Sequence, residues 1–250
     1  MNDHTPWELR INSGAPFTLS TDDTLSLHFD GQHIQSMMSL HDPYRLHLHY
    51  TQAMMAFKLF KQNPETILIV GLGGGSLSKY CFRRFPEASI VTLEIAQDVI
   101  SLRDKFKIPR DSERFRVVHT DAGDHMRHVE NIVDVLLLDG FDATGIPDNL
   151  CSTHFYRDCH RALVDGGLVV ANLSGDDRGL HDQIGRLADV FDGNCLIGYA
   201  RGCNNYIVVA RNGTEQLCDD VSTDVHRLLV KHKKGLHIPD FKTFKDFYRR

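Results

Sequence analysis

Residues 66–75 read TILIVGLGGG, residues 76–85 read SLSKYCFRRF, and residues 88–95 read ASIVTLEI. This order predicts a buried strand, a glycine-rich turn, a helix and a second strand that ends in Glu94. The glycines let the backbone approach a ligand closely, and a carboxylate at the second strand end accepts ribose hydroxyl protons. The stretch therefore predicts a site for a nucleoside-containing cofactor. Ser76 stands where the dinucleotide fingerprint G-x-G-x-x-G has its last glycine.

The chain beyond this stretch alternates between strand-like and helix-like segments. Strands are expected at 66–71, 89–95, 114–119, 133–139 and 167–173, and helices at 76–85, 97–106, 122–129, 152–163 and 179–191. The ILIV and VLLL runs are continuously apolar, which is typical of parallel strands covered on both faces. Two last strands, 195–200 and 204–212, predict an antiparallel hairpin. The pattern favours a Rossmann-like α/β sheet of the class I methyltransferase type, with seven strands, over a dehydrogenase.

A different pattern precedes this sheet. Residues 15–40 read as short strands separated by the turn signals Asp22-Asp23 and Asp30-Gly31. They predict a small N-terminal β-hairpin element, followed by a helix at about 50–60. We therefore expect an element at 1–48 and a catalytic domain at 49–250.

Composition excludes several classes of function. The 250 residues are 42% hydrophobic, which suits one large domain with a small appendage. No apolar run approaches the roughly 20 residues that span a bilayer, and a start without a secretory signal predicts a cytoplasmic protein. A net charge of −5 argues against nucleic acid as a partner. The basic segment at 227–250 is either a solvated surface or a patch for an anionic partner.

Closely spaced histidines raise the question of a metal. His47 and His49 form one pair, and His125 and His128 form another. Neither pair has an acidic or cysteine partner in the sequence that completes a set of ligands. No metal site is expected.

Carboxylates follow the predicted parallel strands at the edge where such sheets bind ligands. Glu94 is the candidate for the ribose hydroxyls. Asp121 either accepts from an adenine amino group or caps the helix that begins at Ala122. Asp139 and Asp142 lie on one loop, where they would attract a sulfonium cation, orient a cationic acceptor and take its proton.

The blocks GLGGGSL, LEIAQDVISL, HTDAGDHM, VDVLLLDGFD and FYRDCHRALVDGGLVVANL resemble the spermidine synthase family of aminopropyltransferases, particularly its bacterial spermidine-synthase-like branch. The resemblance covers roughly residues 25–212. It implies that Asp139 is the general base and that Asp142 positions the amine acceptor. It also implies a cofactor site whose members are Gln35, Gly71, Gly73, Gly75, Glu94, Ile95, Asp121 and Ala122.

Three departures from the family pattern bear on the substrates. Gly73 stands where the family has an aspartate that serves the amine end of decarboxylated S-adenosylmethionine. The family's Tyr-(His/Gln)-Glu pattern is not found in DPYRLHLHYTQ (42–52), and the loop after Asp139 lacks the family's proline. These changes leave the nucleoside site supported and the acceptor undefined.

Three hypotheses follow. The first is a spermidine-synthase-like transferase that moves an aminopropyl group to a small-molecule amine, with S-adenosylmethionine or its decarboxylated form as co-substrate. The second is an S-adenosylmethionine-dependent methyltransferase, which Gly73 favours. The third is a non-catalytic nucleoside-binding or assembly protein, which the missing acceptor acids favour. Its apolar hairpin strands could be buried in a homodimer.

Overall fold

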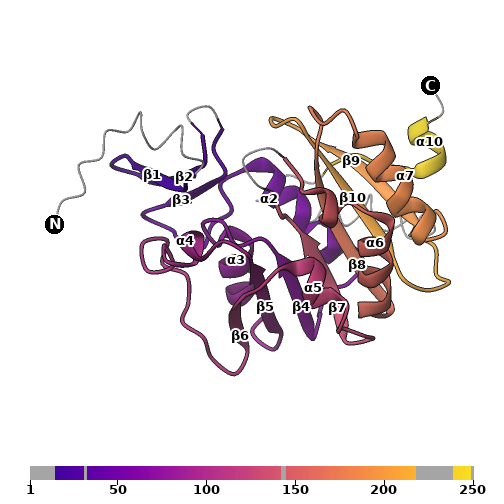
Figure 1. Cartoon of the computed structure of the whole chain (residues 1–250), viewed down its shortest axis with the longest axis horizontal. Helices are drawn as coiled ribbons and strands as arrows, with labels where there is room; N and C mark the ends of the chain where they lie inside the picture. The colour runs from indigo at the N-terminus through magenta and orange to yellow at the C-terminus, as the bar shows by residue number, and fades with distance from the viewer. Residues whose placement is uncertain (1–14, 31–32, 142–144, 218–238, 249–250) are drawn as a thin grey trace.

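The computed structural model describes residues 15–30, 33–141, 145–217 and 239–248. Their elements form a large sheet flanked by helices on both faces, with a small second sheet at one end (Figure 1). No helix in these ranges is long and apolar enough to cross a membrane. Most of the predicted basic segment at 227–250 lies outside the described residues.

The large sheet has the strand order β11-β9-β10-β8-β7-β4-β5-β6. Strands β8, β7, β4, β5 and β6 pair in parallel, whereas β10 is antiparallel to both β8 and β9. The strands are β4 Thr66–Val70, β5 Ser89–Glu94, β6 Phe115–His119, β7 Val133–Leu138, β8 Leu163–Ser174, β9 Cys195–Ala200, β10 Asn205–Arg211 and β11 Phe241–Thr243. All seven predicted strands are present. The sequence pattern did not predict β11, a short edge strand that pairs with β9.

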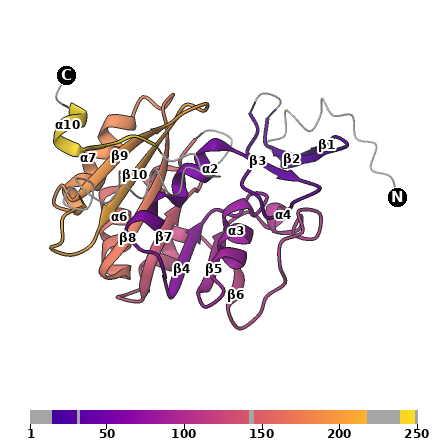
Figure 2. The same ribbon diagram turned by 180° about the vertical axis from the view of Figure 1, so that it is seen from behind.

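Two hydrophobic clusters explain why the parallel strands are apolar throughout. Alternate residues of each strand, such as Ile67 and Leu68 in β4, enter opposite clusters. One cluster lies under α2 His49–Met54, α3 Ser76–Arg84 and α4 Gln97–Ile100. The other lies under α5 Ala122–Met126, α6 Thr153–Ala162 and α7 Leu180–Val190. Burial on both faces holds the carboxyl ends of β4, β5 and β7 in fixed positions. Figure 2 shows the sheet and its helices from behind.

The helices agree with the predictions in place and differ in length. The helix expected at about 50–60 is present as α2, which ends at Met54 and continues as the 3-10 helix η1 Met55–Leu59. The helix expected at 97–106 ends at Ile100, and turns follow as far as Lys107, whose φ is +53°. This segment folds back because Phe106 is fully buried close to Gly74. Shorter described elements are η2 Asp148–Leu150 and α10 Phe244–Tyr248.

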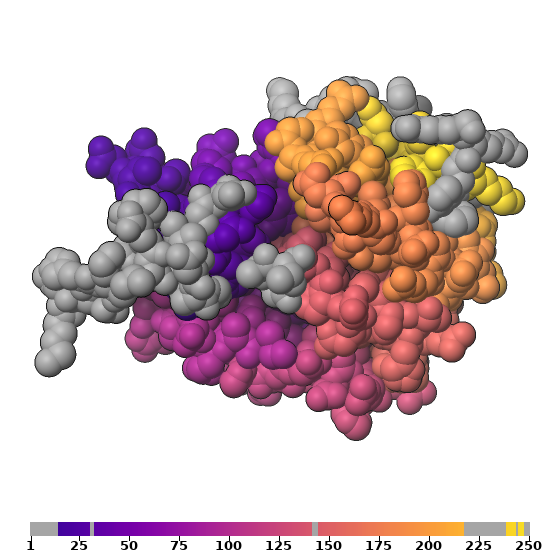
Figure 3. Space-filling model, turned by 45° about the horizontal axis from the view of Figure 1, so that its top comes forward, coloured from indigo at the N-terminus to yellow at the C-terminus, as the bar shows by residue number. Residues whose placement is uncertain are grey.

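The N-terminal strands form a three-stranded antiparallel sheet rather than a single hairpin. Its strands are β1 Phe17–Ser20, β2 Thr24–His28 and β3 Ser36–Ser39. Leu25, Leu27 and Met38 from this sheet enter the cluster under α3. Figure 3 shows the indigo N-terminal segment packed against the magenta part of the chain. The division of the chain into an N-terminal element at 1–48 and a catalytic domain at 49–250 stays a prediction.

Candidate active site

The turn after β4 brings the ends of three strands together. Gly71 has a φ of +94°, and a Cβ at this position would lie 2.3 Å from the carbonyl oxygen of Asp139. Only glycine fits such a close approach with a positive φ. The Gly71 N–H donates to Leu93 O of β5, and the Asp139 N–H donates to Val70 O of β4. The glycine turn therefore places Glu94 and Asp139 at one edge of the sheet.

Glu94 is fixed by the backbone around it. Its Oε2 accepts a hydrogen bond of 2.9 Å from the Leu72 N–H, and its Oε1 accepts one of 2.9 Å from the Ala96 N–H. A carboxylate has about four acceptor positions, so both oxygens keep capacity for further donors. The side chain lines a pocket between β4, β5 and β3. This arrangement suits a pair of ribose hydroxyls.

The pocket has about 550 Å³ of empty space, part of it open to solvent. Its walls come from the small sheet, from α2, from the glycine turn and from the ends of β5 and β7. They are Phe29, Gln35, Ser36, Tyr50, Gly71, Leu72, Gly73, Ser76, Leu77, Glu94, Asp139 and Phe141. Two of these residues are carboxylates and none is a lysine or arginine. The described walls therefore favour a cationic ligand.

Asp139 is the most perturbed carboxylate of this site. Burial raises its pKa from the ordinary value of 3.8 to about 7, and hydrogen bonds from Asn172 and Tyr50 act in the opposite direction. Asn172 Nδ2 donates to Oδ1 at 2.8 Å, and the Tyr50 hydroxyl donates to Oδ2 at 3.5 Å. A carboxylate with a pKa near neutrality is suited to general acid–base catalysis at physiological pH.

Tyr50 is a pocket residue that was not predicted from the sequence. Burial raises its pKa well above 10, and the nearby Asp139 charge adds to the effect, so the hydroxyl stays protonated as a donor. The hydroxyl also lies 3.3 Å from the Gln35 carbonyl oxygen, which joins α2 to the small sheet. The signal was present in the sequence, because Tyr50-Thr51-Gln52 keeps the tyrosine of the family's Tyr-(His/Gln)-Glu pattern. Gln52 replaces its glutamate.

The structure brings together five of the predicted site residues, namely Gln35, Gly71, Gly73, Glu94 and Asp139. It places others outside the pocket walls. Gly75 is the N-cap residue of α3 and faces Ile108, and Ile95 is 64% exposed. Asp142 lies outside the described residues.

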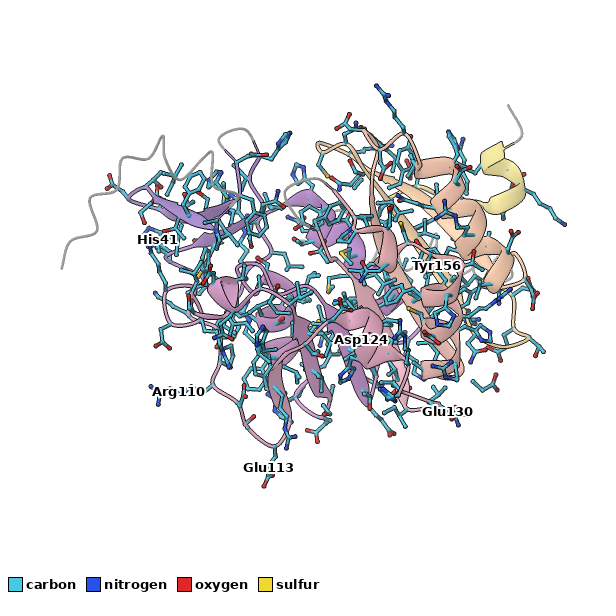
Figure 4. All side chains as sticks on the ribbon, viewed as in Figure 1. His41, Arg110, Glu113, Asp124, Glu130 and Tyr156 are labelled. Atoms are coloured by element: carbon cyan, nitrogen blue, oxygen red, sulfur yellow. The ribbon has the colours of Figure 1, made fainter. Side chains whose placement is uncertain are left out.

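Asp121 caps α5 rather than lining the pocket. Its Oδ1 accepts from the backbone N–H of Asp124, which Figure 4 labels, and its Oδ2 accepts from Asn149 Nδ2. Ala122, the first residue of α5, is buried. The roles of Asp121 and Ala122 at an adenine ring stay predictions. Among the described residues, no group of three or more His, Cys, Asp or Glu side chains is placed to hold a metal.

Comparison with known proteins identifies the family. The model of the spermine/spermidine synthase domain matches residues 47–181, which span the glycine turn, Glu94, Asp139 and Asn172. The chain belongs to the spermine/spermidine synthase family. The resemblance predicted from the sequence is thereby confirmed, as is the assignment of the chain as an enzyme.

Similar family members include two bacterial enzymes. The polyamine aminopropyltransferase of Chromobacterium violaceum is 37% identical over 186 residues, which cover 74% of this chain and 71% of the relative. That of Neisseria meningitidis serogroup A is 32% identical over 220 residues, which cover 82% of this chain and 84% of the relative. Both matches are longer than the segment that the domain model covers.

Solved structures confirm the predicted fold class. A probable spermidine synthase from Corynebacterium glutamicum has a TM-score of 0.75 at 20% identity and covers 92% of this chain and 88% of its own. Human methyltransferase-like protein 13 in complex with SAH has a TM-score of 0.65 at 23% identity, with coverage of 80% and 100%. At such identities the similarity shows the fold alone. Members of this family and methyltransferases share the same sheet.

Proposed function

We propose that this enzyme transfers an aminopropyl group from decarboxylated S-adenosylmethionine to a small-molecule amine. The observation that carries the proposal is the Asp139 carboxylate, which is half-buried at the pocket and has a pKa raised to about 7. An amine must lose a proton before its nitrogen can attack carbon, and an ordinary aliphatic amine is protonated at neutral pH. The raised pKa of Asp139 and its place at the pocket support it as the base that takes that proton.

With Asp139 as general base, the reaction moves one proton, forms one carbon–nitrogen bond and breaks one carbon–sulfur bond. The ammonium group of the acceptor gives one proton to Oδ2 of Asp139. Its nitrogen then forms a bond to the carbon next to the sulfonium, and the carbon–sulfur bond breaks with its electron pair moving to sulfur. The products are a secondary ammonium ion and a neutral thioether, and Asp139 later returns its proton to solvent.

Other residues bind the two substrates. Glu94 accepts hydrogen bonds from the ribose hydroxyls, Gln35 contacts the nucleoside, and Asp142 positions the acceptor amine. Ile95, Asp121 and Ala122 would lie along the adenine ring. The glycine turn accommodates the donor because Gly71 and Gly73 carry no side chain at the pocket wall.

The charge of the pocket supports the decarboxylated donor. Glu94 and Asp139 are the charged groups of its described walls. Two carboxylates repel the carboxylate of intact S-adenosylmethionine and attract the ammonium end of the decarboxylated form. No arginine or lysine among the described wall residues offsets this repulsion.

Product analysis tests the proposal. The purified enzyme is incubated with each donor and a panel of mono-, di- and triamines, and the products are identified by mass spectrometry. We expect methylthioadenosine together with an amine that has gained an aminopropyl group. Binding of the decarboxylated donor without turnover of any amine would contradict the proposal and favour a non-catalytic nucleoside-binding protein.

Gly73 favours a second candidate, an S-adenosylmethionine-dependent methyltransferase. Gly73 lines the pocket where the family has an aspartate, and the hydroxyls of Ser36 and Ser76 lie beside it, 3.3 Å apart. Without that aspartate, one source of repulsion toward the carboxylate of the intact donor is gone. The same product analysis separates the candidates, because methyl transfer gives S-adenosylhomocysteine and a methylated acceptor.

We also propose, from the sequence, that the enzyme is a cytoplasmic homodimer. The apolar sequence of the strands of the small sheet supports the dimer, although their Leu25, Leu27 and Met38 are buried within the same chain. Light scattering after gel filtration measures the mass in solution, and a mass of one chain would contradict the dimer.

A further inference from the structure

Two asparagine side chains lead from the surface turn between β9 and β10 to the proposed base. Asn205 Nδ2 donates to Asn172 Oδ1 at 2.9 Å, and Asn172 Nδ2 donates to Asp139 Oδ1 at 2.8 Å. Asn172 is only 3% exposed, whereas Asn205 is half-buried at the start of β10. A buried amide costs free energy unless its donor and acceptor are both used. Both ends of the Asn172 amide are used here.

Sheet geometry places the three side chains together. Asn172 in β8 lies opposite Ile207 in β10, so Asn205 is its diagonal neighbour on the same face of the sheet. Asp139 follows β7 two positions after Leu137, and side chains two apart on a strand share a face. That face is the one covered by α2, which carries Tyr50. The side-chain amides of Asn205 and Asn172 therefore lie on the face of the sheet that carries the pocket.

The two hydrogen bonds are both donated in the direction from Asn205 through Asn172 to Asp139. An ionised Asp139 only accepts, so Asn172 must present its NH₂ group to it and its oxygen to Asn205. Asn205 supplies the matching NH₂ group. If the Asn172 amide were turned around, its oxygen would face the carboxylate and its NH₂ group would face that of Asn205. Asn205 thus holds Asn172 in the orientation that favours the charged form of Asp139.

The two oxygens of Asp139 are bonded unequally. Oδ1 has the short bond from Asn172, whereas Oδ2 lies 3.5 Å from the Tyr50 hydroxyl. That hydroxyl has one proton and lies 3.3 Å from a second acceptor, the Gln35 carbonyl oxygen. Oδ2 is therefore the less strongly bonded oxygen. It is the one with more capacity for a proton.

We propose that Asn172, held by Asn205, is a positioning residue that fixes Oδ1 of Asp139 and leaves Oδ2 to receive the proton of the acceptor amine. The catalytic part of this inference rests on the proposed function. The hydrogen bonds that orient Asp139 are a property of the enzyme without its substrates. A merely structural role would require only that the amides be hydrogen-bonded.

Tyr50 and Cys203 lie near Asp139 and do not change their charge in the pH range where Asp139 titrates. Tyr50 from α2 contacts it directly, and the Cys203 thiol of the β9–β10 turn lies beyond Tyr50. Burial raises the pKa of both groups, so both are neutral near pH 7. Glu94 of β5 lies on the same pocket wall. A midpoint near neutrality in the carboxyl signal of Asp139 therefore reports the carboxylate itself.

The experiment measures the side-chain carboxyl ¹³C shift of Asp139 against pH in protein labelled at aspartate, with no donor or acceptor added. Asp139→Asn identifies the signal. Asn172→Leu removes the donor, and we expect the midpoint to rise by about one to two pH units, since a hydrogen bond to a charged group is lost. Asn205→Leu should raise it by less, because Asn172 then loses only its orientation.

Asn212→Leu is the matched control. Asn212 follows the other end of β10, and its Nδ2 donates to the carbonyl oxygens of Leu163 and Val164. It should lower the melting temperature without moving the midpoint. An unmoved midpoint in both Asn172→Leu and Asn205→Leu, or an equal movement in the control, would overturn the inference. If Asn172→Leu does not fold, the half-buried Asn205 decides the question.

Turnover separates this inference from the proposed function. If the titration shifts as expected and no amine is turned over, positioning stands and the proposed reaction fails. If turnover is observed, the pH at which kcat reaches half its plateau should move upward in Asn172→Leu together with the midpoint. A loss confined to KM would contradict the positioning role.

Discussion

Asp139→Asn should remove catalysis and stabilise the fold. The substitution keeps the shape of the side chain and can still accept the hydrogen bond from Asn172. It removes the proposed general base, and general bases contribute roughly 100- to 10,000-fold to rate. We therefore expect kcat to fall by about that factor. Glu94 and the glycine turn still hold the nucleoside, but the decarboxylated donor should bind more weakly because one of the two wall carboxylates loses its charge.

The gain in stability follows from the raised pKa. Between the ordinary value of 3.8 and the folded value of about 7, the folded protein binds more protons than the unfolded chain, so stability falls as pH rises. The rise in pKa corresponds to a cost of about 4 kcal/mol above pH 7, at about 1.4 kcal/mol per pH unit. An amide is not ionised and escapes this cost. Asp139→Asn should thus be more stable than the native enzyme at pH 8, with little difference near pH 4.

Urea unfolding at both pH values measures this difference, and a coupled assay measures turnover. Asp134→Asn is the control, because Asp134 lies in β7, which Asp139 follows, and pairs with Lys61 at 2.7 Å. Its pKa is lowered, since hydrogen bonds from Lys61 and from two backbone N–H groups outweigh the effect of burial. That variant should be less stable than the native enzyme at pH 8. Near-normal turnover of Asp139→Asn, or a loss of stability like that of the control, would refute the reasoning.

Three further substitutions have defined outcomes. Gly71→Ala should lower the free energy of unfolding by at least about 2 kcal/mol, because its Cβ would meet the Asp139 carbonyl oxygen at a positive φ; an unchanged urea midpoint would be contrary. Lys79→Met should stabilise the fold at pH 6 by up to about 5 kcal/mol, because burial lowers the Lys79 pKa from 10.5 to about 7 and disfavours its charged form. Since the unfolded chain holds that proton up to about pH 10, the gain should shrink as pH rises from about 7 to about 10 in unfolding experiments, and a constant gain would argue against it. Gly73→Asp should increase the preference for the decarboxylated donor about tenfold in calorimetry, and a greater preference for the intact donor would count against the charge argument.

The parallel strands and their carboxyl ends could be predicted because local and tertiary signals agree there. The continuous apolar runs at 67–70 and 135–138 are buried on both faces, so composition alone indicates their environment. The glycine turn and Glu94 follow from strand order, since ligands bind at this edge. Asp139 was predictable for the same reason.

Features that depend on distant contacts were missed. Tyr50 reaches Asp139 across 89 positions of sequence, and the length of a helix says nothing about such a contact. The helix expected at 97–106 stops early because Phe106 packs near the glycine turn, which helical periodicity does not reveal. The Asp121 carboxylate accepts hydrogen bonds from the Asp124 N–H and from Asn149 Nδ2. Of its two predicted roles, the structure therefore shows the helix cap, and the contact with adenine stays a prediction.

Calorimetric titration with decarboxylated and with intact S-adenosylmethionine, side by side, tests the central claim most directly. A pocket with two carboxylates and no cation among its described wall residues should favour the decarboxylated donor by tenfold or more, about 1.4 kcal/mol. That result supports aminopropyl transfer. Tighter binding of the intact donor would contradict the account and favour methyl transfer.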